Sequence, residues 1–180
     1  MKRIVLIFGV ISGVICSALM LLTVYLSCNT GVIDYDNGVV VGYTGMVIAF
    51  SLVFFGVRSY RESAGGTVTF GRAFAVGILI ALISCAFYVV SWEVIYFNDV
   101  MPDFWAKMSE HELARMKSKG VSAETLEAKR KELAEFKKQY DNPLINAAFT
   151  FIEPFPVGLL AALISAGVLR RREPLQPAMA

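Results

Sequence analysis

The chain has 180 residues, of which 56% are apolar, and its mean hydropathy is +0.59. A typical soluble domain is about 45–50% apolar, so this composition argues against one. The 13 Phe and 7 Tyr exclude a disordered chain, and an odd count of three Cys argues against a disulfide scaffold. The net charge of +2 gives no electrostatic basis for a nucleic-acid partner, and we expect none.

Four long apolar runs predict four transmembrane helices. They cover about residues 4–26, 39–57, 73–97 and 147–169. About 20 helical residues cross the hydrocarbon core of a bilayer. A cleaved signal peptide is the alternative for the first run, but such a segment has only about 7–15 apolar residues. We therefore predict an all-α integral membrane protein, with residues 1–180 forming a single membrane domain in the lipid bilayer.

Basic residues flank alternate ends of these runs and predict the orientation. Lys2 and Arg3 precede the first run, whereas the segment after it, residues 27–38, has two acids and no base. The other anchors are Arg58, Arg61, Arg72, Arg170, Arg171 and Arg172. Because cytoplasmic flanks are rich in Lys and Arg, we expect both termini in the cytoplasm of a bacterial inner membrane.

The segment between the third and fourth runs predicts an extracytoplasmic helical hairpin over about residues 103–140. Gly120 is a typical helix stop, and Ser122 is a typical cap for the next helix. Leu126, Phe136 and other apolar residues form a stripe along this second helix. The stripe predicts packing within the hairpin and on the bilayer surface. The alternative is a surface that binds a membrane or periplasmic protein partner.

Two carboxylates, Glu93 and Glu153, lie inside apolar runs. Counted from the expected outer helix ends, they lie about 6 Å and about 9 Å below the surface. An ionised carboxylate there needs a partner, a proton or water. One hypothesis is a shared intramembrane polar site that handles protons or cations. The other is a pair of interfacial carboxylates that bond to Tyr88, Trp92, Tyr96 or each other.

Pro154 and Pro156 follow Glu153 directly and predict a helix break. Each proline removes a backbone donor, so the result is either a kink or a helix that starts only at Pro156. Small residues recur at four-residue spacing in three of the runs, which favours close packing of helices. The glycines of these stripes are Gly9, Gly13, Gly77 and Gly158.

Catalytic and metal-binding patterns are weak. His111 is the sole histidine, and the Cys spacing fits no metal site. No nucleophile motif accompanies His111. We therefore expect no cofactor, no metal and no enzymatic activity.

Several segments together carry a family resemblance. They are Phe70-Gly71-Arg72-Ala73-Phe74, Asn142-Pro143-Leu144-Ile145-Asn146, Phe151-Ile152-Glu153-Pro154-Phe155-Pro156-Val157-Gly158 and the closing Arg170-Arg171-Arg172. With the four spans and the charged segment, the chain resembles the bacterial membrane-protein family catalogued as domain of unknown function number 4199. The resemblance covers nearly the whole chain. It implies a multi-pass inner-membrane protein and no particular activity, substrate or cofactor.

Three functions remain open from the sequence. The leading hypothesis is a non-enzymatic scaffold or accessory protein that uses the hairpin, because a large exposed element is present without catalytic groups. The second is a small proton- or cation-coupled transporter that uses Glu93 and Glu153. A membrane enzyme that acts on lipid head groups ranks last.

Overall fold

The computed structural model describes residues 1–26 and 35–170. Over these residues the fold is helical, in the order α1 (Lys2–Tyr25), α2 (Tyr35–Ser63), α3 (Phe70–Phe97), α4 (Phe104–Ser118), α5 (Ala123–Tyr140), α6 (Pro143–Ile152) and α7 (Phe155–Leu169). Four stretches are long and apolar enough to cross a membrane: Lys2–Tyr25, Asn37–Ser63, Phe70–Phe97 and Pro143–Leu169. The predicted all-α fold with four membrane-spanning helices is confirmed.

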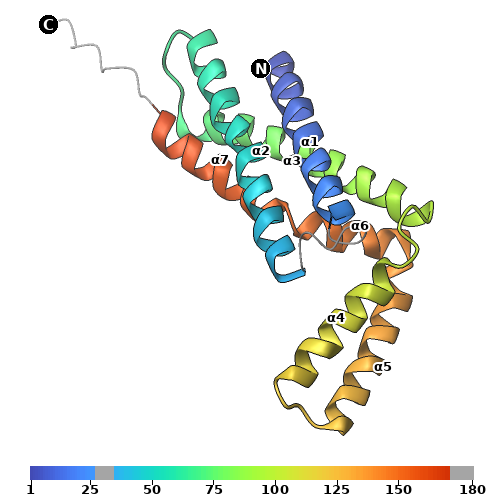
Figure 1. The fold of residues 1–180 in the computed structure, drawn as a ribbon. Coiled ribbons are helices and arrows are strands. Elements are labelled where there is room, and N and C mark those ends of the chain that lie inside the picture. Colours follow the sequence, from blue (N-terminus) through green and yellow to red (C-terminus); the bar gives the residue numbers. More distant parts are fainter. Residues whose placement is uncertain (27–34, 171–180) are drawn as a thin grey trace, which may run out of the picture.

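The helices form two parts (Figure 1). In the first, α3 packs against α1 and α7, and α2 packs against α1 and α7. In the second, α4 and α5 lie side by side and project away from the membrane-spanning helices (Figure 1). We call this second part the α4–α5 hairpin. The short helix α6 contacts both α3 and α5, so it joins the two parts.

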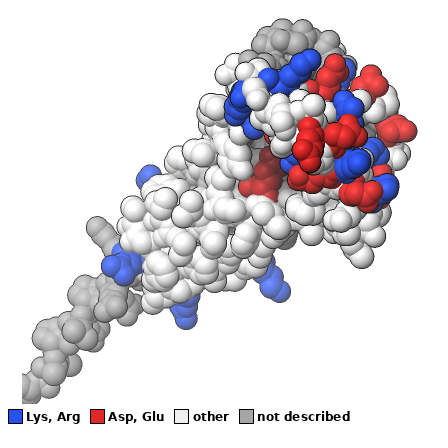
Figure 2. Space-filling model, turned by 90° about the horizontal axis from the view of Figure 1, so that it is seen from below, with Lys and Arg blue, Asp and Glu red and all other residues white. Residues whose placement is uncertain are grey.

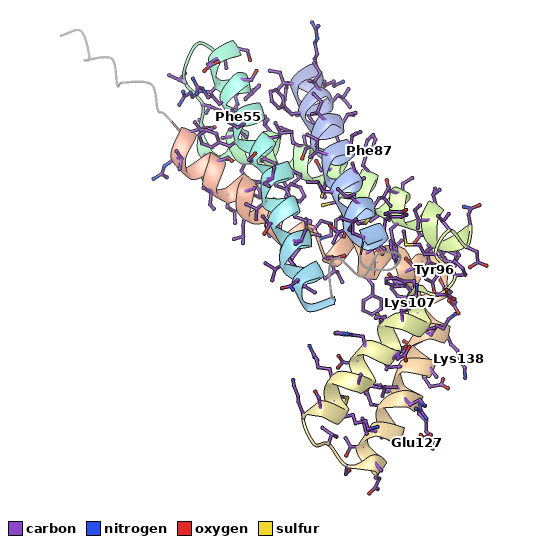
Figure 3. The ribbon with its side chains drawn as sticks, viewed as in Figure 1. Phe55, Phe87, Tyr96, Lys107, Glu127 and Lys138 are labelled. Carbon is purple, nitrogen blue, oxygen red and sulfur yellow. The ribbon has the colours of Figure 1, made fainter. Side chains whose placement is uncertain are left out.

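The outer faces of the spanning helices are apolar. Val40, Val90 and Val168 are each more than 60% exposed, and Phe55, labelled in Figure 3, is 50% exposed. Figure 2 shows a broad uncharged zone between the charged hairpin and a few basic residues at the opposite end. Helices that are apolar on all sides need an apolar solvent, so these faces contact the lipid bilayer.

Small residues let α1 approach α3 closely. A Cβ on Gly9 would lie 2.8 Å from Cβ of Ile83, and one on Gly13 would lie 2.7 Å from Cβ of Phe87. The Ser84 hydroxyl donates to the carbonyl of Gly9 at 3.2 Å, which ties α3 to α1. The glycine stripe of the first run therefore lies at a helix–helix contact.

Small residues also let α7 pack closely on α2 and α3. A Cβ on Gly77 would lie 3.1 Å from Cα of Ala162, and one on Gly158 would lie 2.9 Å from Cβ of Ala81. Sequence reasoning missed Gly56, whose added Cβ would meet Phe8 and Ile80. Gly56 has no small partner four residues away, so the spacing gave no signal there.

Several helix ends differ from the prediction. Helix α2 runs through Ser63 and α3 begins at Phe70, both outside the purely apolar runs, because a helix continues until its caps end it. The fourth span starts at Pro143 and not near residue 147, because the Asn142 side chain caps the backbone N–H groups of Leu144 and Ile145. As predicted, Ser122 caps α5 through Thr125, and Gly120, at φ +75°, ends α4.

Candidate functional site

Glu153 and Pro154 lie at a break in the fourth span. Helix α6 ends at Ile152, and α7 begins at Phe155. Neither Pro154 nor Pro156 can donate a backbone hydrogen bond, which interrupts the helical ladder at this point. The chain is already helical from Pro143, so it makes a break within one span and not a delayed start at Pro156.

The early start of α6 changes the depth of Glu153. Glu153 lies ten residues beyond Pro143, which places it about 15 Å along the helix from the start of the span. The depth expected from the sequence was only about 9 Å. Glu93 lies four residues before the end of α3 at Phe97, at about 6 Å. The two carboxylates therefore occupy different levels of the spanning region, Glu93 near its edge and Glu153 toward its middle.

Glu153 has a buried phenol as its partner. The Tyr88 hydroxyl donates to Oε2 of Glu153 at 2.9 Å, and Tyr88 is only 4% exposed. Glu93 is five residues from Tyr88 on α3, which places it on a different face of the helix. Its Oε1 is buried without a hydrogen-bond partner. Glu93 lines neither of the two cavities that border Glu153.

Glu153 borders two cavities. The larger has a volume of about 230 Å³ and lies between α1, α2, α3 and the helix break. Its walls are mostly apolar: Cys16, Met20, Thr23, Val24, Gly38, Val39, Gly42, Tyr43 and Met46, together with Tyr88 and Glu153. The smaller, of about 120 Å³, extends from Glu153 toward Trp92, Tyr140 and Thr150. A carboxylate thus faces an apolar chamber within the spanning region.

A cluster of aromatic side chains joins the α4–α5 hairpin to α3; we call it the aromatic junction. The Trp92 indole donates to the Tyr140 hydroxyl at 2.9 Å. The Trp105 ring lies 5.2 Å from the ring of Tyr140 and 5.8 Å from that of Phe136, and the Phe104 ring lies 5.0 Å from that of Trp92. Trp105 is the sole fully buried residue of α4, so the base of the hairpin has a core.

Polar groups of α6 complete this junction. The buried Asn146 amide donates to the carbonyl of Tyr140 at 3.2 Å, and its Oδ1 accepts from the Thr150 hydroxyl at 3.2 Å. Burial raises the pKa of the Tyr140 phenol, so it remains a neutral donor and acceptor at physiological pH. Because these groups satisfy one another, the hairpin is held at a defined position on the spanning helices.

Asp141 adds an ionic contact at the same place. Its Oδ1 accepts from Tyr96 at 2.6 Å, and the Lys137 ammonium lies 2.8 Å from its Oδ2. Hydrogen bonds from Lys137 and then Tyr96 hold the pKa of the Asp141 carboxyl below its ordinary value. Such an exposed pair contributes little stability, below about 1 kcal/mol.

The lowered pKa of Asp141 predicts a pH dependence. A carboxyl with a depressed folded-state pKa stabilises the fold above its ordinary pKa, and this contribution is lost as the pH falls through the depressed value. We expect an NMR titration of the Asp141 carboxyl to have its midpoint below that of an ordinary Asp. Lys137→Ala is expected to raise the midpoint, whereas Lys138→Ala, whose ammonium pairs with Glu135, is expected to leave it unchanged. An ordinary midpoint in the native protein would contradict this contact.

The remainder of the α4–α5 hairpin has no core of its own. From Ala106 to Gln139 no side chain is fully buried. An open groove of about 600 Å³ runs between the two helices. Its lining combines apolar and charged residues: Ala106, Ser109, Glu110, Leu113, Ala114, Lys117, Ala123, Leu126, Glu127 and Arg130. We call this the hairpin groove; acidic and basic side chains are mixed over the same part of the molecule in Figure 2.

The basic anchors lie at the opposite end of the molecule. Lys2 and Arg3 are at the start of α1, Arg58 and Arg61 are near the end of α2, Arg72 is in the first turn of α3, and Arg170 follows α7. Arg58 pairs with Glu62 at 2.9 Å. The predicted anchors Arg171 and Arg172 lie outside the described residues.

Sequence reasoning found only part of this arrangement. It named Tyr88, Trp92 and Tyr96 as possible partners of the two glutamates, and the structure pairs Tyr88 with Glu153. Trp92 and Tyr96 turn instead to Tyr140 and Asp141 of the hairpin. The spacing of the three at every fourth residue, which places them on one face of α3, was the available signal.

The described residues gather no group of three or more His, Cys, Asp or Glu side chains that could hold a metal ion. In comparisons with known proteins, the model of the family described as "Protein of unknown function (DUF4199)" matches residues 7–171. No curated protein matches the chain. No solved structure matches it either.

Proposed function

The chain belongs to this family of unknown function, and we propose that it is a non-enzymatic scaffold or accessory protein of the bacterial inner membrane. One observation carries the proposal. The α4–α5 hairpin projects from the spanning helices and yet buries no side chain between Ala106 and Gln139. An exposed element that is fixed at its base and lacks a core along its length is suited to receive a partner.

The base of the hairpin supports the same function. The aromatic junction holds α4 and α5 on α3 and α6, so the hairpin groove is presented in a fixed direction. By contrast, the ion pairs along the hairpin, such as Lys138–Glu135, are exposed and stabilise it little. Figure 3 shows Tyr96 at the junction and Glu127 toward the far end of the hairpin. Because the hairpin is already held in place, it loses less conformational entropy when a partner binds.

The groove indicates the chemistry of the partner. Leu113, Ala114 and Leu126 form an apolar part of the groove lining, whereas Glu110 and Lys117 add charges of both signs. An amphipathic helix with one apolar face and mixed charges at its edges fits this pattern. We therefore propose a helical segment of a membrane or periplasmic protein as the partner.

We also propose that both termini lie in the cytoplasm and the hairpin outside it. The support is the distribution of basic residues, because Lys2, Arg3, Arg61 and Arg72 lie at the end of the spanning helices opposite the hairpin. Positive charge is enriched on the cytoplasmic side of membrane proteins.

Photo-crosslinking in cells tests the scaffold proposal. A photoreactive residue at Ala114, in the hairpin groove, is expected to capture one discrete protein, and Leu126→Glu is expected to abolish the adduct because it places a charge in the apolar part of the groove lining. A photoreactive residue at Lys138, which does not line the groove, is the matched control and is expected not to capture that protein. The proposal would be contradicted if both positions captured the same protein equally. It would also be contradicted if the adduct at Ala114 persisted in the Leu126→Glu variant.

A carrier is the second candidate, and one observation favours it. Glu153 lies toward the middle of a broken span and faces a cavity, a placement seen in the substrate sites of transporters. Because Glu93 is not in that cavity, a carrier would depend on Glu153 alone. Purified protein in liposomes separates the two proposals. Solute movement that Glu153→Gln abolishes would favour the carrier and overturn a purely structural role.

A further inference from the structure

The larger cavity beside Glu153 is open because glycine lines one of its walls. Gly38 and Gly42 lie one turn apart on α2 and both face the cavity. A Cβ on Gly42 would meet no atom within 4 Å, so the space there is real and would accept a larger side chain. The opposite wall, on α1, consists of Cys16, Met20 and neighbouring residues.

Among the described residues, Glu153 is the sole carboxylate that lines this cavity, and none of these lining residues is Lys, Arg or His. The Tyr88 hydroxyl satisfies Oε2 alone. A carboxylate accepts at about four lone-pair positions, so acceptor capacity remains. The Thr23 hydroxyl cannot supply the missing donor, because it donates to the carbonyl of Leu19 in its own helix.

We propose that this cavity binds a small organic cation, an ammonium group carrying an apolar alkyl or aryl body. The ammonium would donate to the Glu153 carboxylate, and the body would lie against the apolar walls formed by Met20, Val39 and Met46. The proposal rests on the Glu153 cavity that favours the carrier, but it requires only binding and no transport.

Size and charge define this ligand class. The cavity volume of about 230 Å³ is smaller than that of pockets for drug-sized ligands, which is about 300–1,000 Å³. The apolar body of the ligand is therefore small. An inorganic cation such as Ca²⁺ or Mg²⁺ takes six or more oxygen ligands, whereas this lining offers one carboxylate. An anionic ligand would face the charge of Glu153 without any basic side chain in the lining to offset it. Glu153 is exposed within the protein and lines the cavity, so a cationic donor there can reach its carboxylate and form a charge-assisted hydrogen bond.

Three probes with the same alkyl chain test the assignment: n-octylammonium, 1-octanol and octanoate. Binding of each radiolabelled probe is measured on the full chain in nanodiscs, with empty nanodiscs subtracted. Saturable binding of n-octylammonium is expected, with roughly tenfold or weaker affinity for 1-octanol, because the neutral head lacks the charge-assisted bond. Octanoate is expected not to bind.

Four variants locate the binding. Glu153→Gln, which keeps the shape and removes the charge, is expected to weaken n-octylammonium binding roughly tenfold or more. Gly42→Leu is expected to abolish it by filling the cavity. The matched controls are Glu93→Gln, which removes a carboxylate outside the cavity, and Gly167→Leu, which adds a side chain in open space on α7. Both controls are expected to bind as the native chain does.

The outcomes separate this proposal from the carrier. Binding that Glu153→Gln abolishes, without movement of n-octylammonium into liposomes, supports the site and contradicts the carrier. Equal affinity for n-octylammonium and 1-octanol would overturn the proposal, because the cavity would then recognise only an apolar chain. Unchanged binding by the Glu153→Gln or Gly42→Leu variant, each checked for the native thermal transition, would also overturn it.

Discussion

Gly158→Leu is expected to destabilise the spanning helices strongly. An added Cβ at Gly158 would lie 2.9 Å from Cβ of Ala81 and 2.9 Å from Cε1 of Phe50. Phe50 is 1% exposed, so its ring has no free space to enter. Overpacking of a dense core costs about 1–3 kcal/mol, and a whole leucine side chain at this contact is expected to reach the upper end.

The measurement is the midpoint of thermal unfolding in detergent, together with the monodisperse fraction on size-exclusion chromatography. Gly167→Leu is the matched control, because it makes the same substitution in the same helix where an added Cβ meets no atom within 4 Å. The control is expected to keep the native midpoint. Similar midpoints for both variants would contradict the close approach of α7 to α2 and α3.

Trp105→Ala is expected to detach the α4–α5 hairpin while leaving the spanning helices folded. Trp105 is 7% exposed and its ring packs against Phe104, Phe136 and Tyr140. Loss of a buried aromatic side chain costs about 3–5 kcal/mol. The rest of the hairpin buries no side chain that could compensate, so α4 and α5 are expected to lose protection together.

Hydrogen–deuterium exchange checks this result helix by helix. Amides of α4 and α5 are expected to exchange faster in Trp105→Ala, whereas those of α1 and α3 are expected to keep their native rates. Phe55→Ala is the control, because Phe55 is 50% exposed on the outer face of α2 and its loss removes no junction contact. Native protection of α4 and α5 in Trp105→Ala would show that the aromatic junction is not what holds the hairpin.

Local signals made several features predictable. The spanning helices follow from apolar runs, because each run must cross the same thickness of hydrocarbon. Gly120 and Ser122 marked the turn of the hairpin, since a left-handed residue and a capping hydroxyl act within a few residues. The fourth span was set about one turn too late because the cap formed by Asn142 lies before the apolar run. This small error placed Glu153 too close to the surface.

Long-range pairings were not predictable from one sequence. Glu93 and Glu153 are chemically alike and both lie in apolar runs, yet Glu153 bonds to Tyr88 and borders a cavity, whereas Glu93 lies on a different face near the helix end. The outcome depends on the rotation of α3 and on the position of the break in the fourth span. Neither is encoded in local spacing, because both are set by how the helices pack.

The sequence by itself determined the class of protein, the four spans, the place of the hairpin and the basic end, because hydrophobicity, capping and charge act locally or on whole segments. Tertiary structure alone decided which carboxylate faces a cavity, which aromatic side chains form the junction, and that the hairpin has a core only at its base. These features require residues such as Tyr88 and Glu153, 65 positions apart, to be brought to one point by packing.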